Sequence, residues 1–197
     1  MINIENRITR HFQDSVDTKQ RVVATLTPHL VVASHAMVEC LKKGGKILAC
    51  GNGGSAGDSQ HFAAELVGRF EREREELAAI ALTTDSSILT AVANDYSFDE
   101  IFSKQVRALG KPGDILFAIS TSGNSKNVVA AVKAAHLKGM HVIGMTGRGG
   151  GSIAGLMQAG DVLLNVDSQE TTRIQEVHLL MLHCLCDAID NLMFGEK

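Results

Sequence analysis

Short apolar runs recur along the chain between longer segments in which apolar residues have helical spacing. These runs read KILAC, AAIALT, DILFAIS, HVIGMT and DVLLNV, at residues 46–50, 78–83, 114–120, 141–146 and 161–166. Each run is close to continuously apolar rather than alternating with polar residues, which is typical of a parallel sheet covered on both faces. The pattern therefore predicts five buried, parallel strands.

Helical patterns separate these runs, at about residues 55–70, in two pieces over 86–108, and at 124–138. Strands that alternate with helices indicate an α/β layered fold with right-handed crossovers between neighbouring parallel strands.

Two long helical patterns flank this unit, at roughly residues 2–43 and 170–193. We expect the first helix to break near Pro28, because proline lacks the N–H that a helix interior needs. The second should end near Gly195. Apolar residues cover much of the circumference of this second helix, so we expect an oligomer with helices in its interface.

The chain has 197 residues, which is most simply one domain with a sizeable core. Its 19 basic and 22 acidic residues give a net charge of −3. This balance disfavours a nucleic-acid partner held through phosphate contacts. The charged run EREREE at 71–76 is interpreted as a solvated connection.

We expect neither a secretory signal nor a membrane span. The N-terminal segment mixes charges throughout, and no run approaches the ~18 apolar residues of a span. The four cysteines, Cys40, Cys50, Cys184 and Cys186, lie in apolar stretches without C-x-x-C spacing. Buried, reduced thiols of this kind favour a cytoplasmic protein.

A glycine-rich turn, GNGGSAG, directly follows the first predicted strand. Gly51, Gly53 and Ala56 fit the loose dinucleotide-binding fingerprint. That fingerprint also requires an acidic residue about 20 positions later, at the end of the second strand. Here the second strand ends near Asp85, well beyond that spacing, so nucleotide binding is the less favoured interpretation.

A second turn, STSGNS, follows the third predicted strand and precedes a helix. Ser120, Thr121, Ser122 and Ser125 supply four hydroxyls, and Gly123 permits a tight turn. Hydroxyl donors and free N–H groups at a helix start suit a phosphate monoester. An ordinary helix cap would use one hydroxyl and leave three unexplained, so we favour phosphate binding.

Polar residues on two helices form a third candidate site. His61 and Glu65, at positions i and i+4, share one helix face, although such a pair is more often structural than catalytic. The second of these helices, at 170–193, carries polar residues within an otherwise apolar segment. Polar groups on a buried helix need hydrogen-bonding partners. These residues are Gln175, Glu176, His178 and His183. Gln175 and His183 are ~12 Å apart along the axis, so they meet at one metal only if both lean inward.

Five segments together resemble the sugar isomerase (SIS) domain proteins and, more narrowly, the phosphoheptose isomerases. The segments read CGNGGSAGDSQHFAAEL, AVANDYSFDEIFSKQ, ISTSGNSKNV, MTGRGGG and RIQEVHLLMLH. The resemblance implies a three-layer α/β/α sandwich with a parallel five-stranded sheet and long N- and C-terminal helices. It also implies a single SIS domain over 1–197, in which 1–43 packs on the core and the oligomer interface, and a cytoplasmic homotetramer with active sites near subunit interfaces.

The activity that this resemblance implies is aldose–ketose isomerisation. The family converts D-sedoheptulose 7-phosphate to D-glycero-D-manno-heptose 7-phosphate, the first step of heptose synthesis for lipopolysaccharide. Chemistry through an enediol needs a base and an acid, for which Glu65 and His183 are the candidates. Zinc, one ion per subunit, could polarise the substrate oxygen. The roles of base and zinc ligand then compete for Glu65.

The resemblance also carries site residues onto this chain. The residues that would contact the substrate are Asn52, Gly53, Gly54, Ser55, Asn94, Asp95, Ser120, Thr121, Ser122, Ser125 and Gln175. The residues that would hold zinc are His61, Glu65, Gln175 and His183. Two positions depart from the family pattern, because Thr172 and Gly149 stand where many isomerases have acidic residues.

Two alternatives accompany the enzyme hypothesis. Proteins that associate with the bacterial replication initiator resemble these isomerases, and the segments HCLCDAIDNLMFG and TTDSSILTAVANDY resemble theirs. That group need not retain the acid and the base, whereas this chain keeps Glu65 and His183, which favours an enzyme. A phosphosugar sensor that binds its ligand without turnover is the other alternative.

Overall fold

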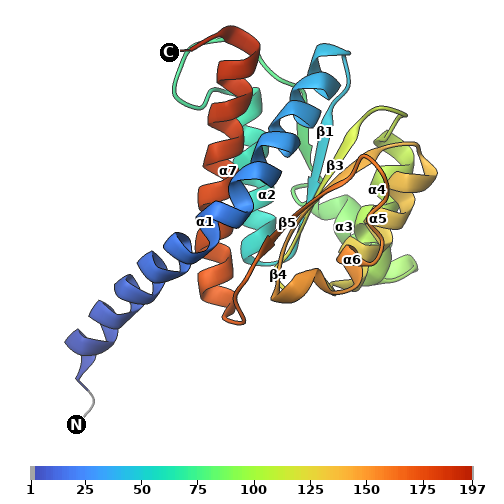
Figure 1. The fold of residues 1–197 in the computed structure, drawn as a ribbon. Helices are drawn as coiled ribbons and strands as arrows, with labels where there is room; N and C mark the ends of the chain where they lie inside the picture. Colours follow the sequence, from blue (N-terminus) through green and yellow to red (C-terminus); the bar gives the residue numbers. More distant parts are fainter. Residues whose placement is uncertain (1–2, 197) are drawn as a thin grey trace.

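A five-stranded parallel sheet forms the middle layer of the molecule (Figure 1). The computed structural model describes residues 3–196. The strands are β1 (Ile47–Cys50), β2 (Ala79–Ala81), β3 (Ile115–Ser120), β4 (His141–Gly147) and β5 (Val162–Val166). Their spatial order is β2-β1-β3-β4-β5, and every pair is parallel. The five strands predicted from the apolar runs are confirmed.

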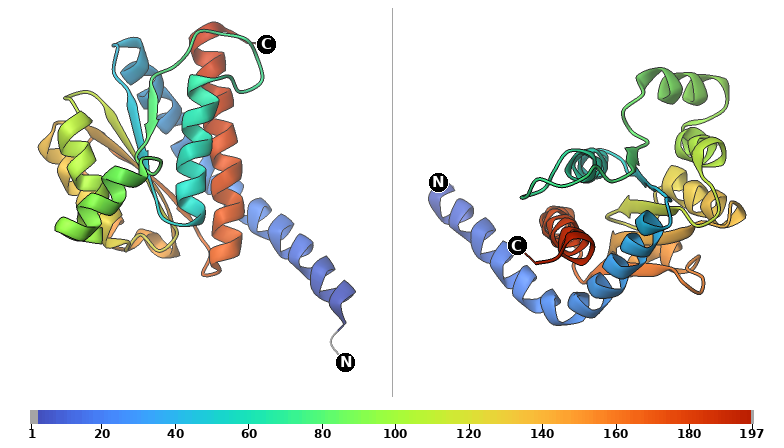
Figure 2. Two further views of the ribbon diagram at one scale, coloured as in Figure 1. Left: turned by 180° about the vertical axis from the view of Figure 1, so that it is seen from behind. Right: turned by 90° about the horizontal axis from the view of Figure 1, so that it is seen from above.

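Helices cover both faces of the sheet, as the α/β/α expectation requires. The helices are α1 (Ile4–Lys42), α2 (Gly54–Val67), α3 (Ser86–Asp95), α4 (Ile101–Leu109), α5 (Lys126–Leu137), α6 (Gly151–Ala154) and α7 (Thr171–Phe194), with short 3-10 turns at Phe98–Glu100 and Arg148–Gly150. One face packs on α1, α2 and α7, and the other on α3, α4, α5 and α6 (Figures 1 and 2).

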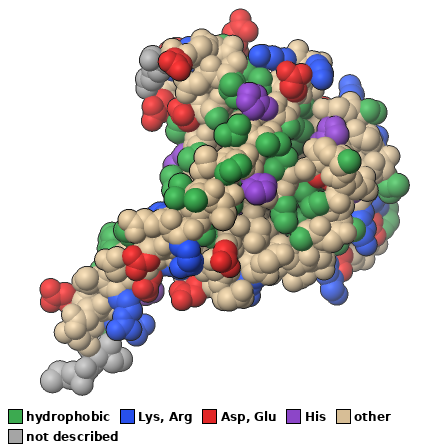
Figure 3. Space-filling view, in the orientation of Figure 1, with side chains coloured by type: hydrophobic (Ala, Val, Ile, Leu, Met, Phe, Trp, Pro, Cys, Tyr) green, Lys and Arg blue, Asp and Glu red, His purple; other side chains and the backbone are tan. Residues whose placement is uncertain are grey.

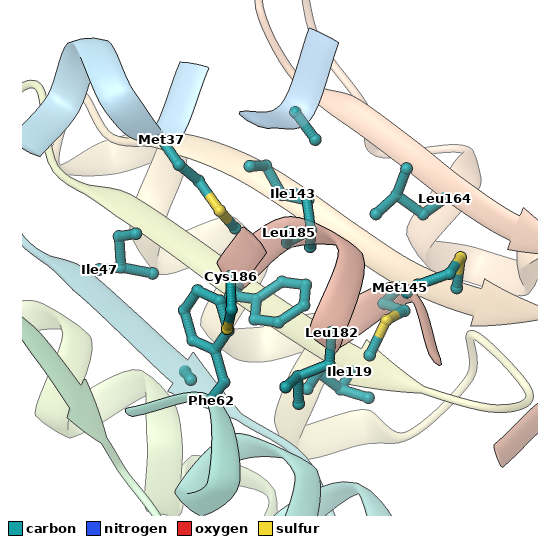
Figure 4. Close-up of a cluster of buried hydrophobic side chains, with 14 of the residues drawn as sticks. Met37, Ile47, Phe62, Ile119, Ile143, Met145, Leu164, Leu182, Leu185 and Cys186 are labelled. Carbon is teal, nitrogen blue, oxygen red and sulfur yellow. The ribbon is translucent and has the colours of Figure 1, made fainter. Parts of the chain in front are cut away.

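Two apolar clusters, one on each face, hold the layers together. On the face of α1, α2 and α7, side chains from three helices meet those of the strands, among them Met37, Phe62, Leu182 and Cys186 (Figure 4). Alternate residues of the same strands enter the opposite cluster, for example Leu116 and Ala118 of β3. Because both strand faces are buried, the strand sequences are continuously apolar.

The first helix runs without interruption through Pro28, so the expected break is wrong. Proline removes one hydrogen-bond donor and bends a helix, and α1 curves along its length when seen from above (Figure 2). The helix continues because its second half is fixed by burial of residues on both sides of the proline, including Leu26, Ala33 and Met37. Tertiary packing therefore outweighs the local signal.

Two helices are long and apolar enough to cross a membrane by length and composition, which differs from the sequence expectation. The most apolar 18-residue windows of α1 and α7 have mean hydropathies of 1.2 and 1.3. In this fold α7 lies in the core, where Arg173, His178 and Asp190 are buried along with its apolar residues. Core helices of this kind meet the same length and composition test.

Candidate active site

The strand order places the carboxyl ends of β1 and β3 side by side. Between these two strands the order reverses, because β2 is added on one side of β1 and β3 to β5 on the other. Ligands of open α/β sheets bind in the crevice outside the carboxyl ends of strands at such a point. The glycine loop (residues 51–53) leaves β1 there, and the hydroxyl loop (residues 120–125) leaves β3. The two turns singled out in the sequence therefore share one edge of the sheet.

Two asparagines join these loops. Asn52 donates from Nδ2 to Oδ1 of Asn127 over 2.8 Å, and Asn127 returns the same bond to Oδ1 of Asn52 over 2.8 Å. Asn127 lies in the first turn of α5 and is buried. The sequence analysis did not single out Asn127, because nothing in a linear pattern indicates a reciprocal amide pair across 75 residues.

The residue that follows the glycine loop, Gly54, lies against the last helix. A Cβ on Gly54 would lie 2.3 Å from Nε2 of Gln175, so any larger residue here would displace the end of this side chain. Gly53 adopts φ +55° at the start of α2, and Ser55 is buried in the first turn. Gln175 thus lies beside the glycine-rich turn whose residues are expected to contact the substrate.

The hydroxyl loop has the form of an anion site rather than a simple helix cap. Oγ of Ser120 and Oγ of Ser125 are 3.0 Å apart, and Ser125 makes no side-chain cap to α5. Asn124 fixes the loop to α6, because its Oδ1 accepts bonds from the N–H and hydroxyl of Ser152 at 2.9 and 2.8 Å. The start of α5 therefore keeps its positive end beside several hydroxyls.

The helices α2 and α7 bring the predicted acid–base residues together. Nε2 of His61 lies 2.8 Å from Oε1 of Glu65. The rings of His61 and His183 meet edge to face, with centroids 5.1 Å apart, and Phe70 packs on His183 at 5.7 Å. His61 and His183 belong to different helices 122 residues apart, so tertiary packing alone places them in contact.

The four predicted zinc ligands are not gathered equally. His61, Glu65 and His183 lie together, whereas Gln175 lies two turns along α7, against Gly54. Among residues 3–196, the structure holds no group of three or more His, Cys, Asp or Glu side chains arranged to bind a metal ion. Carboxylate and imidazole groups are nevertheless ligands that zinc accepts.

Asn94 and Asp95, at the end of α3, interact with each other, with 2.8 Å between Nδ2 of Asn94 and Oδ1 of Asp95. Both are exposed, and α3 buries none of its residues completely. It packs against α4 and the turn at Phe98–Glu100. Their hydrogen bond joins them to each other rather than to the glycine loop.

Two of the polar residues in α7 have structural partners. His178 is buried and lies 3.0 Å from the carbonyl of Thr146, and burial lowers the pKa of this imidazole to about 4. Glu176 accepts a bond of 2.6 Å from Arg173. His178 is therefore neutral near pH 7 and belongs to the core.

Asp58 is a polar residue of this region that sequence reasoning missed. It lines a cavity of about 360 Å³ together with Gly54, Thr172, Gln175, Glu176 and Leu179. Burial raises the pKa of Asp58 to about 6, and the nearby His61 opposes that shift. One turn before His61 on α2, it adds a carboxyl group to the edge of the candidate site.

Comparisons with known proteins agree with this architecture. The profile of the SIS domain matches residues 10–147. A phosphoheptose isomerase of Dechloromonas aromatica is 62% identical over 189 residues, or 96% of each chain. The structure of a phosphoheptose isomerase from Neisseria gonorrhoeae is 56% identical, with a TM-score of 0.92 over 96% of this chain and all of the other. A phosphoheptose isomerase from Francisella tularensis is 45% identical, with a TM-score of 0.94 over the same shares.

Proposed function

The chain belongs to the SIS-domain family, and from this premise we propose that it converts D-sedoheptulose 7-phosphate to D-glycero-D-manno-heptose 7-phosphate. It is an isomerase, because relatives named phosphoheptose isomerase share 62% and 60% of its residues over nearly the whole chain. The activity expected from the sequence motifs is thereby confirmed. The observation that carries the proposal is the meeting of His61, Glu65 and His183 between α2 and α7.

A continuous series of contacts supports a substrate that spans two subsites. The hydroxyl loop opens α5, whose Asn127 pairs with Asn52. Gly54, which begins α2 directly after the glycine loop, lies against Gln175, and α7 carries His183 two turns further on. An open-chain heptose 7-phosphate has its phosphate at one end and its reacting carbons at the other. We assign the hydroxyl loop to the phosphate and the α2–α7 cluster to carbons 1 and 2.

The acid–base chemistry follows from the positions of two side chains. Glu65 removes a proton from carbon 1 of the ketose and returns it to carbon 2. His183 donates a proton to the oxygen on carbon 2 and accepts the proton from the oxygen on carbon 1, so that the enediol becomes the aldose. His61, 2.8 Å from the carboxylate, holds Glu65 in place.

The proposal is tested by incubating the purified protein with sedoheptulose 7-phosphate and following the aldose by ¹³C NMR. The expected result is that the heptose 7-phosphate appears only in samples that contain the enzyme. Ligand binding without turnover would point instead to a phosphosugar sensor. If the protein neither bound nor converted the sugar phosphate, the result would favour the replication-initiator alternative, which the near relatives do not favour.

Removal of one hydroxyl from the loop is expected to weaken recognition of the phosphate. In Ser125→Ala, a charge-assisted hydrogen bond worth ~1.5–3 kcal/mol is lost, which corresponds to a KM about tenfold or more higher with a smaller change in kcat. Steady-state kinetics with sedoheptulose 7-phosphate measures this. The matched control is unphosphorylated sedoheptulose, whose kcat/KM should be equal in the parent and the variant. An equal loss for both sugars would contradict a phosphate role.

We further propose that His61, Glu65, Gln175 and His183 hold one zinc ion per subunit. The donor chemistry of two imidazoles, a carboxylate and an amide oxygen supports this, as do the contacts of His61 with Glu65 and with His183. When bound, the metal polarises the substrate oxygen and stabilises its developing charge.

Metal analysis of protein purified with zinc in the buffers is expected to find about one zinc per subunit. His61→Ala should retain less than about a tenth of that amount, because an imidazole ligand is lost. His29→Ala, an exposed histidine of α1 that contacts the carbonyl of Thr25, is the control and should keep the metal. Equal zinc contents in the two variants would exclude the proposed ligand set.

We propose a homotetramer, supported by an exposed apolar stripe on the first half of α1. Ile4, Ile8, Phe12 and Val16 follow one another at four-residue spacing and are 59%, 54%, 73% and 47% exposed. This half of the helix projects from the body, on a face where other apolar side chains are also exposed (Figures 1 and 3). Large exposed apolar patches mark protein interfaces. Light scattering that gave the mass of one subunit would rule the tetramer out.

We also place the reaction in the cytoplasm, at the first step of heptose synthesis for lipopolysaccharide. The cysteines support a reducing compartment, because all four are free. Three of them are buried as expected, whereas Cys184 is exposed, so the expectation of a buried thiol is wrong there. A strain without this chain should make lipopolysaccharide that lacks heptose, and a normal heptose content would contradict this placement.

A further inference from the structure

The segment between α2 and β2 contains a buried arginine. The sequence EREREE suggested a solvated connection, and for Arg74 this interpretation is wrong, because only 1% of its side chain is exposed. An arginine is rarely buried without partners, since its charge must be compensated. Its partners therefore indicate why the chain places it there.

Arg74 binds the C-terminal end of α2. Its Nη2 donates to the carbonyl of Glu65 over 2.6 Å, and its Nη1 donates to the carbonyls of Leu66 and Gly68 over 2.8 and 3.0 Å. The last four carbonyls of a helix lack partners within it, and the negative end of the helix dipole favours a cation. Arg74 thus fixes the backbone of Glu65 itself.

The same side chain binds α7. Its Nε donates to Oδ1 of Asp190 over 2.9 Å, and the side chain of Asp190 is only 4% exposed. Asp190 lies seven residues after His183, about two helical turns or ~10.5 Å along α7. One guanidinium therefore joins the helix that carries Glu65 to the helix that carries His183.

We propose that Arg74 is a positioning residue for the isomerisation, which sets the placement of the Glu65 carboxylate relative to His183. The inference rests on the proposed roles of Glu65 and His183. The base must reach a carbon-bound proton while the acid reaches the neighbouring oxygens, and a misplacement of about 1 Å can cost about a hundredfold in rate. Two helices that slide against each other would change this spacing, and Arg74 with Asp190 prevents the sliding.

Arg72 offers a matched comparison within the same segment. It donates to the carbonyls of Phe194 and Gly195 at the end of α7, and its guanidinium lies 6.0 Å from the centroid of the Phe194 ring. These contacts are with the end of α7 and the residue after it, whereas those of Arg74 bridge α2 and α7. Arg72→Lys therefore perturbs the attachment of this segment without the bridge to Glu65.

The test is Arg74→Lys, which keeps the charge but cannot reproduce the planar fork of donors. We expect kcat to fall about 10- to 100-fold and KM for sedoheptulose 7-phosphate to change less than about twofold, because the hydroxyl loop is untouched. Arg72→Lys should stay within about twofold of the parent in both constants. Circular dichroism and assays well below each unfolding midpoint ensure that folded enzymes are compared.

A cycle with Glu65→Gln separates positioning from simple destabilisation. Once the base is gone, its placement no longer matters, so Arg74→Lys should lower the residual rate of Glu65→Gln by less than about twofold. If Arg74 had only a structural role, Arg74→Lys would lower kcat by the same factor in the parent and in Glu65→Gln, and that result would overturn the proposal. If Arg74→Lys does not fold, Asp190→Asn replaces it in the same cycle, since it weakens only the link to α7.

The outcomes distinguish this inference from the proposed function. An inactive parent protein would contradict both the isomerase function and the positioning role of Arg74. An active parent with unchanged kcat in Arg74→Lys, or in Asp190→Asn where that variant is used, would overturn the positioning role and leave the isomerase in place. A loss of kcat that depends on Glu65 supports it.

Discussion

Glu65→Gln is expected to lower kcat for sedoheptulose 7-phosphate by about a thousandfold, within the range usual for general acid–base residues. The substitution keeps the size of the side chain and its ability to accept a hydrogen bond, while it removes the basic carboxylate. The oxygen that faces His61 at 2.8 Å can remain in place, so we expect little change in stability. KM should change far less than kcat, because the hydroxyl loop and α5 are unaffected.

His183→Gln should produce a loss of similar size, since the oxygens of the enediol then lack their proton donor and acceptor. His29→Gln on the exposed side of α1 is the control and should retain parental kcat. The assay is the same ¹³C NMR conversion, with the unfolding midpoint of each variant measured alongside. Parental turnover in either active-site variant would exclude that residue as base or acid.

Gly123→Ala is expected to reduce the free energy of unfolding by about 3 kcal/mol and to raise KM for the phosphorylated substrate. Gly123 adopts φ +65°, which costs a non-glycine residue ~1–2 kcal/mol. A Cβ there would also lie 1.9 Å from the carbonyl oxygen of Gly150, a backbone atom that cannot rotate away. The hydroxyl loop and the turn before α6 would have to separate, which displaces the phosphate-binding hydroxyls.

Gly149→Ala is the matched control for this prediction. Gly149 has φ +78°, but an added Cβ meets nothing within 4 Å. It should therefore cost only the conformational term of ~1–2 kcal/mol and leave KM unchanged. Urea unfolding at one protein concentration measures both variants, since oligomerisation makes stability depend on concentration. Equal losses of stability would show that contact with Gly150 is unimportant.

Much of the fold follows from local patterns, and the exceptions have a common cause. The five strands and the helices between them were predicted because burial on both faces leaves continuous apolar runs, and helices leave a 3.6-residue period. Pro28 and, within the run EREREE, Arg74 were misinterpreted from equally local signals. In both cases packing against distant residues, on α7 and the sheet, outweighs the preference of the segment itself.

The candidate site divides in the same way. The sequence alone determined the chemistry of its parts, because turn glycines, clustered hydroxyls and an i, i+4 pair are readable within a few residues. Only the tertiary structure decided that His61 meets His183, that Asn52 pairs with Asn127, and that Arg74 joins Glu65 to α7. Those contacts connect residues 9 to 122 positions apart, and their geometry depends on how two helices pack on the sheet. Periodicity records which face of each helix is buried, but not which side chain of another helix lies opposite to it.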